Sequence, residues 1–290
     1  MIDEKLVQLI TEEVIRQLAA TGRVRLPGKE GSFVPQLVED EDLASPAAKA
    51  KTLVEDPEDP EALARMKKRT TARIGVGNCG PRLNTRTLLT LRADHAAARD
   101  AVFKDVDPAL IERLGLVSVE TQCDCKNTYV TRPDLGRKLS EEAVETLRAR
   151  CTAAPDVQIF AADGLSSTAI ESNLERILPV LTDGLKAKGL KVGTPFYLRY
   201  GRVASEDHVS EVLGAKVVCV LIGERPGLAT AESMSAYIVY NAYVGMPESK
   251  RTVVSNIHRN GLTAVEAGAY IVEVIGQILE KKASGVDLVK

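Results

Sequence analysis

The stretch VQIFAADGLSS, residues 157–167, decides the fold class of this chain. Its first part, 157–162, is an apolar run of strand length, and a helical segment follows from Thr168 to about Lys188. An apolar run without polar alternation is typical of a strand that other elements cover on both faces. The stretch therefore predicts a strand, a turn and a helix of an α/β protein.

The same alternation of apolar runs and helical segments continues toward the C-terminus. Further strands are expected at 195–200, 216–222, 235–240 and 252–257, with a short helix ending at Leu213 and a longer one from Thr263 to about Lys282. Parallel strands joined by helices on both faces form an open, doubly wound sheet. We therefore predict an α/β fold with a doubly wound, mostly parallel sheet for residues 151–290.

Residues 68–150 are predicted to form a smaller N-terminal α/β subdomain. The expected elements are a strand at Ala72–Val76, a helix at Thr85–Phe103, a strand at Leu116–Thr121 and a helix from Ser140 to about Cys151. Ser140, with Glu141–Ala143 behind it, has the pattern of a capping box, which predicts the start of that last helix.

The first 67 residues differ in composition from the rest. Residues 1–20 place apolar side chains four apart, at Ile2, Leu6, Ile10, Val14 and Leu18. This spacing gives an amphipathic helix with one apolar stripe. Residues 21–67 are rich in proline, glycine and charge, which predicts a flexible linker. The resulting N-terminal extension is a helix on a tether, which either packs back on its own chain or docks on another protein.

Composition excludes several classes of function. The chain has 290 residues, a net charge of −2, 4% aromatic residues and no tryptophan, so we expect no nucleic-acid partner. It has no apolar run of about 18 residues, and we expect no contact with a membrane. The five cysteines are scattered and odd in number, which indicates a reducing compartment.

Two cysteines, Cys123 and Cys125, stand close together in the sequence. Zinc sites commonly space their cysteines two to four residues apart and need two more ligands nearby. His95, His208 and His258 are distant in the sequence. We therefore expect a solvated loop here and no metal ligands.

Gly75, Gly77 and Gly80 spell G-x-G-x-x-G and raise the alternative of a dinucleotide site. In such a site the third glycine lies in the first turn of a helix whose N-terminus holds the pyrophosphate. Here the best N-cap positions are Asn84 and Thr85, so Gly80 should lie in a loop before the helix. We expect this motif not to bind NAD.

Polar and small residues collect after the predicted strands of residues 151–290. In open α/β sheets, ligands bind beyond the carboxyl ends of the strands. The residues at these ends are Asp163 and Gly164, then Gly201, Arg202 and Val203, then Gly223, Glu224, Arg225, Pro226 and Gly227, and finally Ser255, Asn256 and His258. Their mixed charge favours a large, polar, neutral ligand over a phosphate.

Several of these positions also have a plainer structural interpretation. Ser166 and Ser167 are expected to cap the next helix, and no G-x-S-x-G motif occurs. His258 is either an acid–base group or a loop histidine bonded to backbone, and the second is favoured. Glu224 and Arg225 are either ligand contacts or a surface ion pair.

Five strings of the chain resemble one protein family. They are TRPDLGR (131–137), PDVQIFAADGLSSTAI (155–170), GLKVGTPFYLRYGRV (189–203), IGERPGLATAESMSAYIVY (222–240) and RTVVSNIHRNG (251–261). Together they are similar to the small subunit of ethanolamine ammonia-lyase over residues 68–290. The length and order of these strings make the resemblance specific.

The resemblance implies a subunit of a carbon–nitrogen lyase that converts ethanolamine to acetaldehyde and ammonia with adenosylcobalamin. In this family a large barrel subunit holds the substrate and most catalytic groups, and the small subunit covers the opposite side of the corrin ring. The family thus implies a hetero-oligomer in which this chain supplies the lower part of the cobalamin site. No catalytic residue is expected in this chain, which should be inactive alone.

Three residues are implied as cobalamin contacts by their places in the family motifs: Val203 in YGRV, Glu224 in GERPG and Val253 in RTVVSN. The last position is often cysteine in the family, so only a backbone contact would remain here. Corrin side chains are mostly primary amides, for which the Glu224 carboxylate is an acceptor. The string D-x-H-x-x-G, which supplies a histidine to cobalt in some cobalamin proteins, is absent. We expect cobalt to take no ligand from this chain.

The helix predicted at 1–20 resembles a family tag that directs the enzyme into protein-shelled microcompartments of the bacterial cytoplasm. Shell or cargo proteins would then be partners in addition to the large subunit. Two alternatives of other classes stay open. One is a nicotinamide-dependent oxidoreductase built on Gly75–Gly80, and the other is a non-enzymatic scaffold whose strand-end crevice is only a subunit interface.

Overall fold

A computed structural model describes Glu13 and residues 42–288 of the chain. The chain divides into two units, Met1–Asp42 and Leu43–Lys290. Apart from Glu13 and Asp42, the predicted helix at 1–20 and residues 21–42 of the predicted linker lie outside the described residues. The second unit contains the elements that carry the candidate site.

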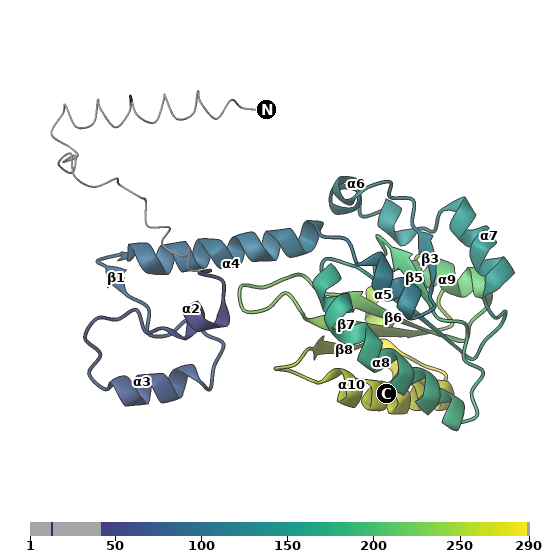
Figure 1. Ribbon diagram of the computed structural model, residues 1–290. Helices are drawn as coiled ribbons and strands as arrows, with labels where there is room; N and C mark the ends of the chain where they lie inside the picture. Colours follow the sequence, from purple (N-terminus) through teal and green to yellow (C-terminus); the bar gives the residue numbers. More distant parts are fainter. Residues whose placement is uncertain (1–12, 14–41, 289–290) are drawn as a thin grey trace. The chain divides into compact units, whose positions relative to one another are not determined.

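A six-stranded sheet is the centre of the second unit (Figure 1). In spatial order its strands are β3 (Val117–Glu120), β5 (Phe196–Arg199), β4 (Val157–Ala162), β6 (Val217–Gly223), β7 (Met234–Tyr240) and β8 (Thr252–Ile257). The first four are parallel, whereas β7 is antiparallel to β6 and β8 is antiparallel to β7. The predicted α/β class is confirmed.

The two antiparallel strands follow from the connections that lead to them. Consecutive parallel strands are joined by α7 (Glu141–Arg150), α8 (Ser167–Ala187) and α9 (Ser205–Leu213). By contrast, the connections 224–233 and 241–251 contain only one 3-10 turn, η2 (Glu248–Lys250). Because a parallel neighbour requires a long crossover, these short connections return the chain antiparallel.

Helices cover both faces of the sheet, as a doubly wound arrangement requires. α8 and α10 (Ala264–Lys281) pack on one face, and α7 and α9 pack on the other (Figure 1). Alternate residues of β6 point to opposite faces of the sheet. Val217, Cys219 and Leu221 face α8 and α10, and Val218, Val220 and Ile222 face α7 and α9. This division explains why β6 is apolar throughout.

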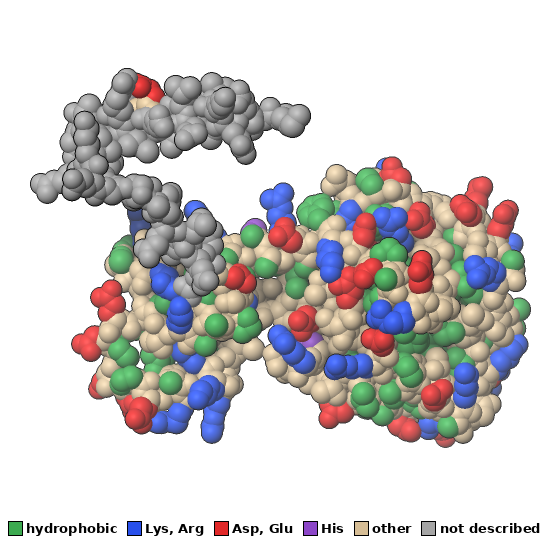
Figure 2. Space-filling model, viewed as in Figure 1, with side chains coloured by type: hydrophobic (Ala, Val, Ile, Leu, Met, Phe, Trp, Pro, Cys, Tyr) green, Lys and Arg blue, Asp and Glu red, His purple; other side chains and the backbone are tan. Residues whose placement is uncertain are grey.

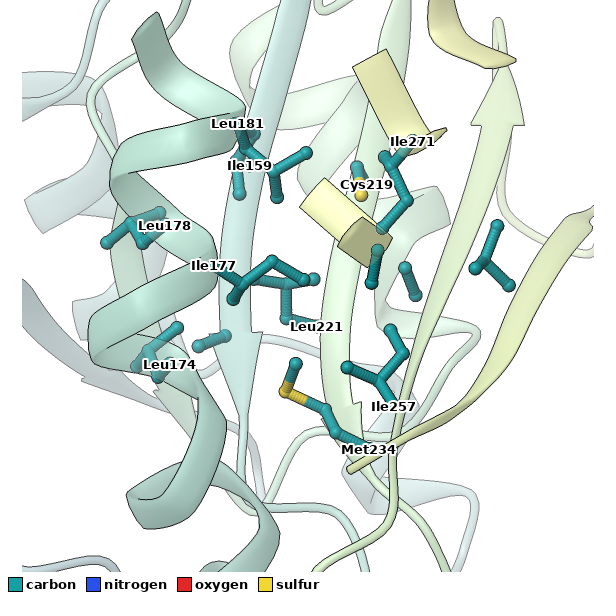
Figure 3. Close-up of a cluster of buried hydrophobic side chains, with 14 of the residues drawn as sticks. Ile159, Leu174, Ile177, Leu178, Leu181, Cys219, Leu221, Met234, Ile257 and Ile271 are labelled. Atoms are coloured by element: carbon teal, nitrogen blue, oxygen red, sulfur yellow. The ribbon is translucent and has the colours of Figure 1, made fainter. Parts of the chain in front are cut away.

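The larger core lies between the sheet and helices α8 and α10. Figure 3 shows the side chains that meet there, among them Leu174, Ile177 and Leu181 of α8, Ile159 of β4, Leu221 of β6 and Ile271 of α10. Fully burying one leucine side chain contributes about 1.5–3 kcal/mol. This shared apolar contact holds the helix layer on the sheet.

Short elements precede the sheet: α2 (Pro46–Ala50), α3 (Pro60–Lys67), β1 (Asn78–Cys79), β2 (Arg82–Leu83), α4 (Thr85–Phe103) and α5 (Pro108–Arg113). The first two lie within residues that the sequence assigns to the linker. The side chains of Ser45 and Asp59 cap these helices, and a proline begins each of them. Such local signals form short helices even within a segment of linker composition.

The predicted strand at Ala72–Val76 is wrong. Gly75 adopts a φ of 67°, a left-handed conformation that interrupts an extended strand. Its carbonyl accepts the N–H of Leu53 at 2.8 Å. The helix predicted at Thr85–Phe103 is confirmed as α4, and Asn84 caps it.

Serine side chains begin two helices where the sequence predicts them. Ser140 accepts the Ala143 N–H at 3.1 Å to cap α7, and Ser166 accepts the Ala169 N–H at 3.2 Å to cap α8. The predicted capping box at Ser140 is only half formed, because Ala143 has no side chain that could accept in return. The Ser140 N–H donates to the Glu120 carbonyl at 3.1 Å instead.

The remaining described elements are α6 (Lys126–Thr131), η1 (Leu135–Arg137) and η3 (Gly285–Asp287). Within residues 42–288, no helix has both the length and the apolar character of a membrane span. Figure 2 shows Lys and Arg interspersed with Asp and Glu over the visible face. That face offers no extended basic surface of the kind that binds nucleic acid.

Two glycines allow the loops after β4 and β6 to touch. A Cβ on Gly223 would lie 2.1 Å from the Ser166 carbonyl oxygen and 2.5 Å from that of Asp163. Gly164 has a φ of 55°, and a Cβ there would lie 2.3 Å from the Gly223 carbonyl oxygen. The Leu165 N–H donates to this same oxygen at 3.0 Å. Glycine is therefore required where the carboxyl ends of the two strands meet.

We expect Gly223→Ala to destabilise the fold by about 1–3 kcal/mol, because the added methyl group must push two backbone carbonyls aside. Gly227 in the same loop is a matched control, since a Cβ there meets nothing closer than 3.9 Å. Gly227→Ala should change the free energy of unfolding by less than about 0.5 kcal/mol. Urea unfolding of both variants measures the difference, and equal midpoints would contradict the close contact.

Candidate functional site

The carboxyl ends of β4, β5 and β6 lie at one edge of the sheet because the three strands are parallel. Asp163 directly follows β4, Tyr200 follows β5 and Glu224 follows β6. The structure thus brings together the strand ends at which the sequence predicts a ligand site.

Asp163 is fully buried and holds neighbouring loops together. Its Oδ2 accepts from Lys126 Nζ at 2.8 Å, and its Oδ1 accepts the Tyr200 N–H at 2.6 Å. Burial raises the pKa of this carboxyl, and the charge of Lys126 opposes the shift. Both oxygens are occupied, so Asp163 supports the edge of the sheet rather than contacting a ligand.

A cationic and aromatic cluster fixes α6 and η1 beside this edge. Lys126 Nζ lies 5.3 Å from the Tyr129 ring centroid and 5.5 Å from that of Tyr200, within cation–π range. Arg202 Nη2 donates to the Tyr129 carbonyl at 2.6 Å, and the Arg202 N–H donates to the Gly136 carbonyl at 2.9 Å. Arg202 therefore holds loops in place.

The Cys123–Cys125 segment belongs to the same cluster. Cys125 is exposed, as expected, but Cys123 is buried against Tyr129 and Tyr200. Burial raises the pKa of the Cys123 thiol, which stays protonated at neutral pH. In the part of the chain that the structure describes, no group of three or more His, Cys, Asp or Glu side chains is placed to hold a metal ion.

Glu224 and Val253, two of the three residues implied as cobalamin contacts, are both neighbours of Tyr237 in β7. Tyr237 of β7 donates its O–H to Glu224 Oε1 at 3.2 Å and stands opposite Val253 in the β7–β8 ladder. Burial and the Glu224 charge raise the pKa of Tyr237 to about 12, so the phenol remains a donor at neutral pH. Glu224 thus bonds Tyr237, and Arg225 is exposed beside it.

Val203, the third implied contact, lies on the same side of the sheet. It is half-buried and packs against the cluster between the sheet and helices α7 and α9, which Tyr237 also contacts. Its carbonyl accepts the Glu206 N–H at 3.1 Å, at the start of α9. All three implied contacts therefore share the α7/α9 side.

This side of the sheet is open over β8. Val254 is 6% exposed on the α8/α10 side, whereas its neighbour Val253 is 45% exposed on the other. β8 is also an edge strand of the described sheet, although its end is paired, since the Asn256 carbonyl accepts the Leu262 N–H at 3.0 Å. We call this surface the β8 face, and it is the candidate site. It comprises Val203, Glu224, Tyr237, Val253 and the exposed Ser255.

Two other predicted positions have structural roles. His258 is buried, its Nδ1 accepts the Asn260 N–H at 3.2 Å, and its Nε2 lies 3.0 Å from Asn256 Oδ1. These contacts confirm the interpretation of His258 as a loop histidine bonded to backbone. Ser167 donates its hydroxyl to the Lys104 carbonyl and so ties the start of α8 to the end of α4.

The glycine motif at 75–80 does not form a phosphate cradle. Gly80 lies in the turn between β1 and β2 with a φ of 60°, and α4 begins beyond it at Thr85. A pyrophosphate would have to bind at a helix start that Gly80 does not reach. The prediction that Gly80 lies in a loop is confirmed.

Sequence reasoning missed Tyr237 and a group of buried charges beside the β8 face. Glu206 and Asp207 begin α9, Arg251 precedes β8, and all three are buried. The acidic pair at a helix start and the arginine before an apolar run are visible in the sequence. That they meet is visible only in the fold.

Comparisons with known proteins agree with the motif strings. Residues 60–289 match the family model described as ethanolamine ammonia-lyase light chain (EutC). The chain is 49% identical to the ethanolamine ammonia-lyase small subunit of Clostridium tetani, covering 97% of this chain and 99% of the relative. It is 48% identical to that of Fusobacterium nucleatum, with 99% of each chain covered.

A third relative, from Clostridioides difficile, is 44% identical over 99% of this chain and 100% of its own length. The matches therefore span nearly the whole chain. This chain belongs to the ethanolamine ammonia-lyase small-subunit family.

Proposed function

We propose that this chain works in an adenosylcobalamin-dependent complex that converts ethanolamine to acetaldehyde and ammonia. Membership of the small-subunit family supports lyase activity as part of such a complex. A small subunit implies a large-subunit partner, and we assign the substrate and the catalytic groups to that partner.

We infer that the β8 face forms the lower part of the cobalamin site, with Val203, Glu224 and Val253 as contacts. One observation carries this inference. Glu224 and Val253 are linked through Tyr237, and Val253 is 45% exposed on this side of β8, whereas Val254 on the opposite side is 6% exposed.

The residues of the β8 face suit the chemistry of a corrin ring. Its amide side chains both donate and accept hydrogen bonds. Glu224 offers a carboxylate acceptor that Tyr237 orients, and the exposed Ser255 offers a hydroxyl group that both donates and accepts. Val253 has no thiol, so its contact would run through backbone and apolar surface.

When bound, adenosylcobalamin supplies the radical chemistry of the reaction, and the residues of this chain hold and orient its ring. We further propose that cobalt takes no ligand from this chain. His208 Nδ1 accepts the Leu139 N–H at 3.0 Å, and His258 is engaged in its own turn. Both histidines near the sheet thus have structural partners.

Reconstitution tests the proposed activity. This chain, the large subunit and adenosylcobalamin together should release acetaldehyde and ammonia from ethanolamine, whereas this chain with the cofactor alone should release neither. Turnover by this chain alone would contradict the division of roles. Full turnover by the large subunit alone would favour the scaffold alternative, and NAD binding in calorimetry would favour the oxidoreductase alternative.

We expect Glu224→Gln to weaken cobalamin binding by the reconstituted complex by about 1–2 kcal/mol, because a neutral amide replaces a charged acceptor. Absorbance titration with cyanocobalamin measures the change in Kd. Glu273→Gln is the control, since Glu273 pairs with Lys188 on the α8/α10 side. Equal affinities of the two variants would remove Glu224 from the site.

We also propose that residues 1–20 direct the complex into a protein-shelled microcompartment of the bacterial cytoplasm by binding shell or cargo proteins. The apolar stripe of this segment and its separation by a linker-like composition support the proposal. Deleting residues 2–20 should preserve turnover but remove most of the complex from isolated microcompartments. A deletion variant that stays fully encapsulated would contradict this role.

A further inference from the structure

A buried ion cluster next to the β8 face has no role in the function described so far. The Arg251 side chain is 1% exposed, its Nε lies 3.2 Å from Glu206 Oε2, and its Nη2 lies 2.6 Å from Asp207 Oδ1. Its Nη1 lies 3.1 Å from Glu248 Oε2 and donates to the Met246 carbonyl at 3.3 Å. All three guanidinium nitrogens are engaged, and their partners come from separate segments.

A gain in stability does not explain this ion cluster well. Glu206 and Asp207 are 0% and 3% exposed, burial raises the pKa of both carboxyls, and the Arg251 charge opposes these shifts. Removing such ions from water costs several kcal/mol each, and packed apolar residues of similar volume often stabilise a protein as well or better. Among the described residues, Glu206 Oε1 also lacks a hydrogen-bond partner. The cluster is therefore better explained by the geometry it imposes.

The cluster joins the segments that carry the implied cobalamin contacts. The Glu206 N–H donates to the Val203 carbonyl at 3.1 Å, so the buried carboxylate lies one turn from Val203. Arg251 stands two residues before Val253, which faces Tyr237 across the ladder. A shift of the guanidinium would move the start of α9 relative to β8.

We propose that Arg251 is a positioning residue of the cobalamin site, setting the spacing between the start of α9 and β8. This inference rests on the proposed function of the β8 face. The planar guanidinium binds Glu206 and Asp207 at once through separate nitrogens, whereas a lysine ammonium is a single point charge. A rigid ring held by contacts on both segments is sensitive to the distance between them.

The test measures cyanocobalamin binding by the assembled complex of this chain with the large subunit. Arg251→Lys keeps the charge but can satisfy only one of the two buried carboxylates well. We expect this variant to assemble and its Kd to rise at least about tenfold, equivalent to about 1.4 kcal/mol. With adenosylcobalamin and ethanolamine, kcat at saturating cofactor should be retained, because Arg251 touches no reacting atom.

Lys250→Met is the matched control. Lys250 is the neighbouring residue and also forms an ion pair, but its partner is Asp287 in η3 rather than a carboxylate of α9. This variant should lose some stability and keep the wild-type Kd. Arg251→Met should lose more affinity than Arg251→Lys, since it leaves both buried carboxylates without a cation.

An Arg251→Lys complex with an unchanged Kd overturns the inference. So does a lysine variant that no longer assembles, because that result assigns Arg251 to folding alone. The Kd of the Glu224→Gln complex distinguishes failure of this inference from failure of the proposed function. If neither Glu224→Gln nor Arg251→Lys alters the Kd, the β8 face does not bind the cofactor. If only Glu224→Gln alters it, the face binds cobalamin and Arg251 does not position it.

Discussion

Burial of the central strands β4 and β6 on both faces is the constraint on which the rest of the structure depends. Every residue of the two strands is buried, so their sequences are almost entirely apolar. Apart from Gln158, which donates to the Thr194 carbonyl, the polar side chains lie beyond the ends of these strands. Asp163, Tyr200 and Glu224 accordingly lie directly after a strand. Beside them, Gly164 and Gly223 let the loops after β4 and β6 touch. The candidate site lies near this edge because the interior of the sheet excludes it.

Charged side chains have different roles beside β4 and β5 and beside β6 and β8. Near β4 and β5, buried Lys126 and Asp163 close the edge of the sheet around aromatic rings. Near β6 and β8, Glu224 is held by a neutral phenol and keeps a half-exposed carboxylate. A neutral partner leaves the charge of Glu224 available to a ligand, whereas a buried ammonium would neutralise it. This contrast separates the supporting part of the edge from the part that can bind.

Much of the fold could be predicted from the sequence because its signals are local. The apolar runs of β4, β6 and β7 and the caps at Ser140 and Ser166 act within a few residues, and the structure follows them closely. The predicted strand at Ala72–Val76 failed because the same apolar residues surround a glycine with a left-handed backbone. The sequence did not predict helices α2 and α3, because the proline-, glycine- and charge-rich composition of residues 21–67 outweighed the short capping signals at Ser45 and Asp59.

Less of the candidate site could be predicted from the sequence. Motif strings implied Val203, Glu224 and Val253 separately, but nothing local joins them. Tyr237 connects two of them only because β7 runs antiparallel between β6 and β8. The two carboxylates of α9 that bind Arg251 lie more than forty residues earlier in the chain, at the start of that helix. Contacts of this kind depend on topology, and a single sequence does not encode them as a readable pattern.

The antiparallel order of the last two strands also affects how much of the sheet is covered on the α7/α9 side. Packed helices lie about 8–10 Å apart and neighbouring strands about 4.8 Å apart, so one crossover helix shields about two strands. Among the described residues no crossover helix precedes β7 or β8, yet Ser235 and Val239 of β7 are 0% exposed, so the open strip on the α7/α9 side is confined to β8. A planar ligand wider than this one strand would also have to rest on the loops beside it.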